Sequence, residues 1–223
     1  MLTWSYSSIK TFDQCPKKYF HLKVAKDVKD SGSEATIYGQ AVHTAAEEYI
    51  RDGVAVPAKF KFIEPTLEAL NAIEGEKHCE VKLGLKVVFT EKEYEPCGFY
   101  DKDVWWRGIA DLVIINGDTA YSVDYKTSKN AKYADTKQLD IVATALFYHY
   151  PQLDKVKSAL AFVVSNEFIR KTHYRENISN YVQGFTPMLE RLIAAQETDV
   201  WNPVSGPLCR FCPVVHCEHN RKN

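Results

Sequence analysis

The chain has 223 residues, with 28 Lys and Arg against 29 Asp and Glu, so its formal net charge is −1. With 45% hydrophobic and 26% charged residues it can bury a core, which excludes disordered and fibrous proteins, and its charge balance excludes a basic, histone-like coat. No stretch approaches the roughly 18 apolar residues of a membrane span and the first residues lack a signal-peptide pattern, so we expect a cytoplasmic protein without a membrane partner.

Residues 1–76 have the patterns of helices. Ser7 is a candidate N-cap for a helix over Ser8–Lys23. Apolar residues recur at helical spacing in Ile37–Arg51, and Asp52-Gly53 ends that helix. A short helix is expected over Glu64–Ile73.

Residues 77–176 have the alternation of strands. Apolar and polar residues alternate from Glu80 to Phe89, which predicts a strand with one solvated face. Asn116-Gly117-Asp118 is a strong hairpin-turn sequence. The remaining elements of this region are predicted as two strands around that turn (Val104–Ile115 and Tyr121–Lys126), a helix from about Tyr133 to Tyr150, and strands over Val156–Val164 and Arg170–Arg175.

Residues 177–223 begin with an amphipathic helix over Tyr181–Gln196. From Trp201 the chain is rich in Pro and Cys, and this tail has too few apolar residues to fold without a staple. No linker long enough to separate two domains interrupts the chain, so we expect residues 1–223 to form a single domain.

Two aspartates lie in the strands that flank the predicted turn. If residues Asn116–Thr119 form a four-residue loop, paired residue numbers sum to 235 and Asp111 lies directly opposite Asp124. A two-residue turn gives a sum of 233 and a diagonal pair about 7–8 Å apart. In either register Lys126 shares the face of Asp124, because the strand period is two.

Two carboxylates and a lysine suit hydrolysis of a phosphodiester. A divalent cation on the carboxylates neutralises phosphate oxygens and lowers the pKa of a bound water, and the ammonium orients that water. The alternative is a structural Asp–Lys salt bridge near a sheet edge.

These residues resemble the PD-(D/E)XK nucleases, and in particular their RecB-like branch. GIAD supplies Asp111 and VDYK supplies Asp124 and Lys126, in the order and spacing of that family. The segment IYGQAVHTAAEEYI resembles the family's G-x-x-x-H helix, with His43 as the histidine. Gln138 resembles the glutamine of the Q-x-x-x-Y motif.

The sequence departs from that last motif, because Val142 stands where the tyrosine belongs. Tyr148, further along the same predicted helix, is a substitute candidate. Glu80 precedes the first core strand, where many relatives carry a glutamate, and is a secondary candidate for the site; a solvated glutamate on the strand face is the alternative.

The resemblance implies a fold and a set of roles. The fold is α/β and restriction-endonuclease-like: a mixed central sheet flanked by helices, with a helical N-terminal part and a Cys-rich C-terminal tail stapled to it. Lys126 would orient the nucleophilic water, and Gln138 would position that water or the substrate. The implied ligands of Mg²⁺ or Mn²⁺ are His43, Asp111, Asp124 and the backbone carbonyl of Tyr125.

Three of the six cysteines form a C-x2-C-x4-C pattern in the tail, Cys209, Cys212 and Cys217, and Cys15 is the natural fourth ligand. Four thiolates suit either a [4Fe-4S] cluster or zinc. The arrangement resembles the iron–sulfur staple of the AddB subunit and of CRISPR-associated RecB-like nucleases, which favours the cluster. For zinc, His216 and His219 are further candidate ligands. Cys79 and Cys97 have no matching context.

Together these features predict a metal-dependent deoxyribonuclease, more an exonuclease on single-stranded DNA or frayed ends than an endonuclease. It would serve recombination, repair or replication in a prokaryote or its virus. The alternatives are a non-catalytic DNA-end-binding or adaptation subunit with a structural metal cluster, and a zinc-stapled interaction protein. The chain has no G-x-x-x-x-G-K-[ST] motif, so a helicase or recombination protein would be a separate partner. The resemblance includes ring-forming relatives and so implies an oligomer as one option, while no sequence feature identifies an assembly interface.

Overall fold

The computed structural model describes residues 2–29, 32–88, 93–132 and 134–220, so Phe89 and Tyr133 of the predicted elements lie outside the described residues. The chain divides into two compact units: residues 33–183 form the first, and residues 2–32 with 184–223 form the second. No helix in the described part of the chain combines the length and apolar character needed to cross a bilayer.

The first unit is built on a six-stranded mixed sheet with the order β2-β1-β3-β4-β5-β6. Neighbouring strands are antiparallel except β4 and β5, which are parallel and are joined through α5. The predicted mixed sheet is therefore confirmed, and the edge strand β2 is an addition to it. The strands are β1 (Glu76–Val88), β2 (Glu93–Cys97), β3 (Trp106–Asn116), β4 (Thr119–Lys126), β5 (Lys155–Phe162) and β6 (Glu167–Tyr174).

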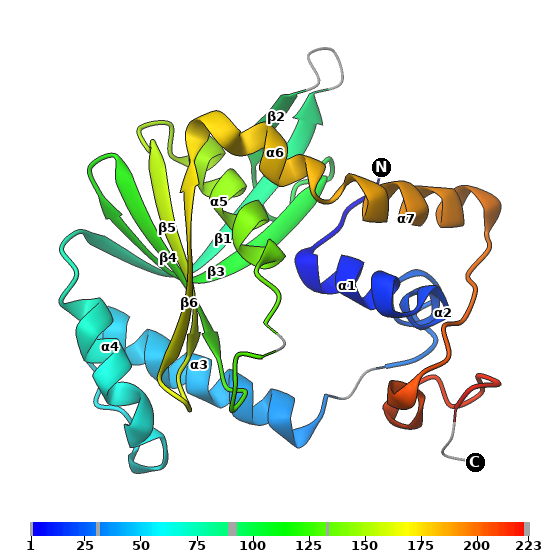
Figure 1. Ribbon diagram of the computed structural model, residues 1–223, viewed down its shortest axis with the longest axis horizontal. Coiled ribbons are helices and arrows are strands. Elements are labelled where there is room, and N and C mark those ends of the chain that lie inside the picture. Colours follow the sequence, from blue (N-terminus) through cyan, green and yellow to red (C-terminus); the bar gives the residue numbers. More distant parts are fainter. Residues whose placement is uncertain (1, 30–31, 89–92, 133, 221–223) are drawn as a thin grey trace. The chain divides into compact units, whose positions relative to one another are not determined.

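One face of the sheet is covered by α3 (Glu34–Asp52), the 3-10 turn η2 (Ala58–Ile63) and α4 (Glu64–Asn71) (Figure 1). Ser33 caps α3, and Gly53 ends it in a left-handed conformation with φ of 68°, as the sequence predicts. The core on this face joins the helices to alternate residues of β3 and β4. It includes Val42, Ala46, Ile63, Leu67, Leu112, Ile114 and Val123.

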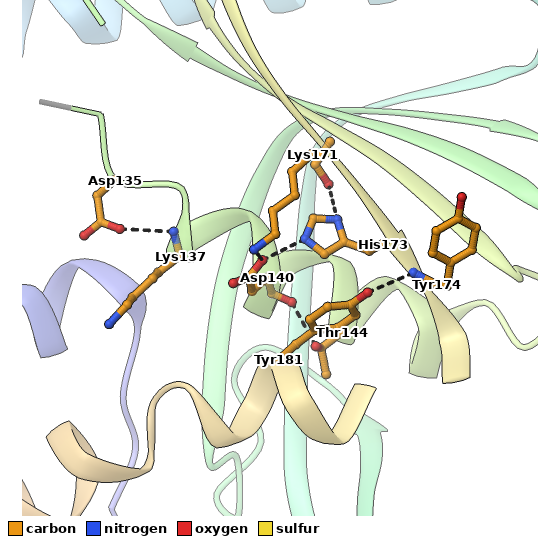
Figure 2. A network of polar contacts seen from close by, with 9 residues as sticks. Asp135, Lys137, Asp140, Thr144, Lys171, His173, Tyr174 and Tyr181 are labelled. Carbon is orange, nitrogen blue, oxygen red and sulfur yellow. Dashed lines mark hydrogen bonds and ion pairs between the residues drawn. The ribbon is translucent and has the colours of Figure 1, made fainter. Parts of the chain in front are cut away.

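The opposite face is covered by α5 (Lys137–His149), whose residues from Ile141 to Phe147 are all buried. A polar network also fastens α5 to the sheet (Figure 2). The Asp140 carboxylate lies 2.8 Å from Nε2 of His173 and 2.6 Å from Nζ of Lys171, both on β6. His173 is fully buried, and its Nδ1 is 3.2 Å from the Ser158 hydroxyl. α6 (Ile178–Gln183) packs on α5 in the same unit.

The second unit joins the two ends of the chain. It contains α1 (Tyr6–Gln14), α2 (Pro16–Tyr19), the π-helical turn η1 (Phe20–Val24), α7 (Thr186–Thr198) and the 3-10 turn η4 (Pro207–Phe211). Aromatic rings supply much of its core. Trp201 stacks on Tyr19 with ring centroids 5.9 Å apart, and Trp4 contacts Phe185 at 5.4 Å.

Two predicted helices are interrupted. The helix predicted over Ser8–Lys23 is wrong in its cap and its length: Ser5 is the N-cap, and the chain is extended at Cys15. Pro16 explains the break, because proline disfavours a helical conformation in the residue before it. The helix predicted over Tyr181–Gln196 is divided into α6 and α7. Gly184 lies between the two helices, and Pro187 lies in the first turn of α7.

The predicted solvated face of β1 is also incomplete. Leu83, Gly84 and Leu85 are all buried, because His149 of α5 covers the polar face at Gly84, with its Nε2 2.8 Å from the Gly84 carbonyl oxygen. A Cβ atom at Gly84 would lie 2.8 Å from the Cys97 carbonyl oxygen, so glycine permits the close approach of β2.

Candidate active site

The β3–β4 hairpin brings two aspartates together where its strands separate. Asn116 pairs with Thr119, so paired residue numbers sum to 235, the first of the two predicted registers. The backbone ladder stops one residue short of Asp111. There the Asp111 carboxylate accepts a hydrogen bond from the Tyr125 backbone N–H at 2.8 Å. Asp111 thus replaces a backbone partner and occupies the position opposite Asp124.

His43 approaches the same point from α3. Its Nε2 donates to the Tyr125 carbonyl oxygen at 3.0 Å, which leaves Nδ1 facing the Asp111 carboxylate at 3.4 Å. Burial lowers the pKa of His43, but the hydrogen bond and charge of Asp111 outweigh burial and raise it overall. Gly39, one turn before His43, faces Thr127: a Cβ atom there would lie 3.4 Å from Oγ1 of Thr127, at van der Waals contact.

Glu80 joins this cluster through an unusual backbone. It has a positive φ of 51° in the middle of β1, and the β1–β3 ladder omits it. A ligand atom of Glu80 lies within 4.8 Å of those of His43 and Asp111. Burial, and then the negative charges of Asp111 and Glu47, raise the pKa of the Glu80 carboxyl. A left-handed residue inside a strand costs about 1–3 kcal/mol and is typical of functional sites.

Asp124 lies on the other side of β4, toward α5. Gln138 donates from Nε2 to Asp124 Oδ1 at 2.5 Å, and Nζ of Lys126 lies 2.6 Å from Oδ2. Lys126 also donates to Oε1 of Gln138 at 3.2 Å, which closes a three-residue ring. Burial is the main cause that raises the pKa of Asp124; the charge of Lys126 opposes it.

The donor set fits a divalent cation. The two carboxylates of Glu80 and Asp111 and the imidazole of His43 converge, with Asp124 nearby, and hard cations such as Mg²⁺ and Mn²⁺ prefer carboxylate oxygens. Oδ2 of Asp124 is buried, and the ammonium of Lys126, 2.6 Å away, is its partner.

A hollow of about 380 Å³ opens beside His43 and Lys126, at the end of β4. It exposes polar groups that the sequence analysis did not select, among them the hydroxyls of Thr127 and Ser128. The feature of the sequence that could have indicated these two residues is their position directly after Lys126. Its full lining is Ala35, Thr36, Gly39, Gln40, His43, Tyr125, Lys126, Thr127 and Ser128.

The structure does not bring Tyr148 to this site. Its ring lies beside Tyr94, with centroids 6.1 Å apart. Ten residues separate it from Gln138 along the α5 helix, which is about 15 Å of helical rise. Tyr148 therefore belongs to an aromatic group near β2, and Val142, at the tyrosine position of the motif, is buried.

The second unit contains a pocket of about 210 Å³ that Cys15, Cys209, Cys212 and Cys217 line together. Backbone N–H groups point at two of the sulfurs: Val204 donates to Cys15 at 3.4 Å and Gly206 donates to Cys209 at 3.3 Å. The four sulfurs do not all lie within 4.8 Å of one another, as the ligand atoms of His43, Glu80 and Asp111 do. They surround a space instead of converging on a point.

The sequence of residues 3–217 matches the model of the PD-(D/E)XK nuclease superfamily. Among solved structures, the chain is similar to the protein SSO0001, with 16% identity, a TM-score of 0.52, and coverage of 98% of this chain and 86% of that one. It is also similar to a protein described as a "putative exonuclease" from Eubacterium rectale, with 16% identity, a TM-score of 0.53, and coverage of 93% and 86%. Among curated proteins, none matches the chain.

A mixed six-stranded sheet with helices on both faces, and a carboxylate–lysine cluster where two of its strands separate, define a restriction-endonuclease-like α/β protein. The chain belongs to the PD-(D/E)XK nuclease superfamily, whose members use divalent metals such as Mg²⁺ or Mn²⁺.

Proposed function

We propose that the chain is a divalent-metal-dependent deoxyribonuclease that acts as an exonuclease on single-stranded DNA or frayed ends. The observation that carries the proposal is the convergence of His43, Glu80 and Asp111 beside the ring of Asp124, Lys126 and Gln138. The similarity to a described exonuclease agrees with it. A cytoplasmic role in recombination, repair or replication, with a separate helicase or recombination partner, belongs to the same proposal.

Each side chain has a separable task. The cation would be held by Asp111, Asp124, Glu80 and His43. The carbonyl oxygen of Tyr125 is a further candidate metal ligand next to them. The bound cation supplies charge neutralisation at the scissile phosphate and a water of lowered pKa. Lys126 holds its ammonium at the Asp124 carboxylate, where it can orient a water that attacks phosphorus. Gln138 holds Lys126 and Asp124 in one orientation.

The hollow beside Lys126 suits a strand of nucleic acid. Hydroxyls of Thr127 and Ser128 and the amide of Gln40 line it, and such groups position phosphates without reading sequence. Lys129, Lys132 and Lys137 follow in the chain and supply positive charge to a molecule whose total charge is −1.

Degradation of end-labelled DNA tests the proposal. Wild type is expected to shorten single-stranded DNA with Mn²⁺, and Asp124→Asn is expected to lose this activity. Asp118→Asn, in the exposed turn of the same hairpin, is the matched control and is expected to retain it. Equal digestion by wild type and Asp124→Asn would refute the nuclease. Binding of DNA ends without digestion by wild type would favour a non-catalytic end-binding subunit.

Blocked and circular substrates test the exonuclease part separately. Protection of a circular single strand, with digestion of its linear form, is expected. Cleavage of the circle would show an endonuclease.

For the cysteine pocket we propose a [4Fe-4S] cluster. A cluster is a cube that needs room between its ligands, and the pocket that the four cysteines help to line has a volume of about 210 Å³. A single zinc ion at about 2.3 Å from each sulfur would need them to converge. Backbone N–H groups directed at Cys15 and Cys209 are the kind of hydrogen bond that tunes cluster thiolates. Purified wild type is expected to be brown, and Cys212→Ser to be colourless; a colourless wild type containing zinc would refute the cluster.

A further inference from the structure

A second group of metal-binding side chains lies in the second unit, outside the cysteine pocket. Ligand atoms of His21, Asp27 and His216 all lie within 4.8 Å of one another. His219 lines the cysteine pocket, whereas His216 does not. The group is therefore distinct from the four thiols, although His216 directly precedes Cys217.

The two imidazoles meet through the same ring atom. Nε2 of His21 lies 3.3 Å from Nε2 of His216, and the rings are nearly perpendicular at 83° with centroids 4.6 Å apart. Two nitrogens bound to one tetrahedral zinc ion at about 2.0–2.1 Å are about 3.3–3.4 Å apart. The observed separation therefore equals the edge of a zinc coordination tetrahedron.

Asp27 fixes the chemical form of His21. Its two carboxylate oxygens lie 3.0 and 3.1 Å from Nδ1 of His21. A carboxylate only accepts, so Nδ1 carries the hydrogen and Nε2 of neutral His21 has a free lone pair directed at His216. A carboxylate that orients a histidine in this way is the usual outer partner of a metal-bound imidazole.

The local backbone makes this pairing possible. His21 lies in the π-helical turn η1, where Ala25 N–H bonds to the Phe20 carbonyl at 2.9 Å, and Lys26 then has a positive φ of 54°. The chain turns back after Lys26, and Asp27 returns to His21. Asp27 and His216 are exposed, so water can complete the coordination of an ion.

We propose that His21 and His216 bind a Zn²⁺ ion through their Nε2 atoms, with Asp27 orienting His21 and water as the remaining ligands. Imidazole nitrogens suit Zn²⁺ better than Mg²⁺, so this site takes a different metal from the carboxylate cluster. The ion would tie the turn after α2 to the loop between Cys212 and Cys217. This proposal does not depend on nuclease activity.

Zinc content of the full chain tests the proposal. The protein is purified without removing or adding any metal at the cysteine pocket. It is then dialysed against buffered Zn²⁺ in excess Mg²⁺, and the zinc and iron contents per chain are measured. His21→Ala and His216→Ala are each expected to hold one Zn²⁺ per chain fewer than wild type. Asp27→Asn is expected to weaken the affinity for that ion by about 10–100-fold. His78→Ala, a histidine beside Glu76 in the first unit, is the control and is expected to bind as wild type.

Two further measurements exclude misfolding as the cause. Iron content and near-UV circular dichroism of the variants without zinc are expected to match wild type, and Zn²⁺ is expected to raise the melting temperature of wild type but not of His21→Ala or His216→Ala. Unchanged zinc content in either histidine variant would overturn the proposal and leave a plain imidazole–imidazole hydrogen bond.

Discussion

Glu80 combines a strained backbone with a carboxylate of the proposed metal site. Its φ of 51° is costly for any residue with a Cβ atom, and its carboxyl is crowded by Asp111 and Glu47. Glu80→Gly is therefore expected to stabilise the fold by about 1 kcal/mol, which raises the melting temperature by roughly 2–4 °C. The same change removes a proposed cation ligand, so the nuclease rate with Mn²⁺ is expected to fall at least about tenfold. Calorimetry and an end-label assay measure the two effects.

Asn166 supplies the control for Glu80. It has a similar φ of 56°, lies between β5 and β6, and belongs to none of the ligand groups. Asn166→Gly is expected to leave the nuclease rate unchanged. A Glu80→Gly protein with lower stability and full activity would contradict the role assigned to the Glu80 backbone and carboxylate.

Lys126 is predicted to act on the reaction more than on DNA binding. Its ammonium is held at Asp124 and Gln138, inside the site. Lys126→Ala is expected to lower kcat by roughly 10²–10³-fold, the usual loss when one preorganised donor is removed. Lys129→Ala, three residues later and exposed, is expected instead to weaken DNA binding in a salt-dependent way with little change in kcat. Equal kcat in wild type and Lys126→Ala would exclude the role of Lys126 in orienting water.

Among the secondary-structure elements, α5 depends on one polar attachment. Asp140 connects the helix to Lys171 and to the buried His173 on β6 (Figure 2). Burial raises the pKa of Asp140, but the hydrogen bonds from His173 and Lys171 outweigh it and leave the pKa below its usual 3.8. Since Gln138 lies on the same turn of α5, the attachment also fixes a residue of the proposed active site.

Asp140→Asn is expected to destabilise the protein by about 2 kcal/mol at pH 7, because hydrogen bonds to a charged group are lost. A carboxyl with a lowered folded pKa stabilises the fold above its unfolded pKa and loses that effect as pH falls through the folded value. The difference between wild type and Asp140→Asn is therefore expected to shrink below about pH 4. Urea unfolding of both proteins from pH 7 to pH 3 measures it, with the exposed Asp154→Asn as control. A difference that stays constant over this range would contradict the charge-based attachment.

Local sequence predicted those parts of the site that local chemistry determines. The turn at Asn116 limited the hairpin to two registers, and the structure has the one that places Asp111 opposite Asp124. The left-handed conformation of Glu80 was not predictable, because it arises from the fit of β1 around the cluster and not from any turn residue in the sequence. Sequence periodicity also does not predict that Pro16 ends α1, because apolar residues continue through the break.

For the whole molecule, the two compact units differ in how they achieve stability. The first has a continuous sheet with helices on both faces, whereas the second has about 70 residues, short helices and a tail with little regular structure. A unit of that size seldom obtains more than about 3–5 kcal/mol from its core alone. The aromatic contacts of Trp201 with Tyr19 and Phe20 contribute, but much of the tail between residues 203 and 220 lines the cysteine pocket.

Loss of the cysteine ligands is therefore expected to unfold the second unit without unfolding the first. In Cys15→Ser with Cys212→Ser, limited proteolysis is expected to cut within residues 2–32 and 184–223 and to leave a fragment close to residues 33–183. Mass spectrometry of the fragments measures this, and Cys97→Ser, a cysteine of β2 outside the pocket, is expected to resist the protease as wild type does. If the double variant keeps the wild-type cleavage pattern, the pocket does not stabilise the second unit. In that case the aromatic contacts hold its two chain ends together.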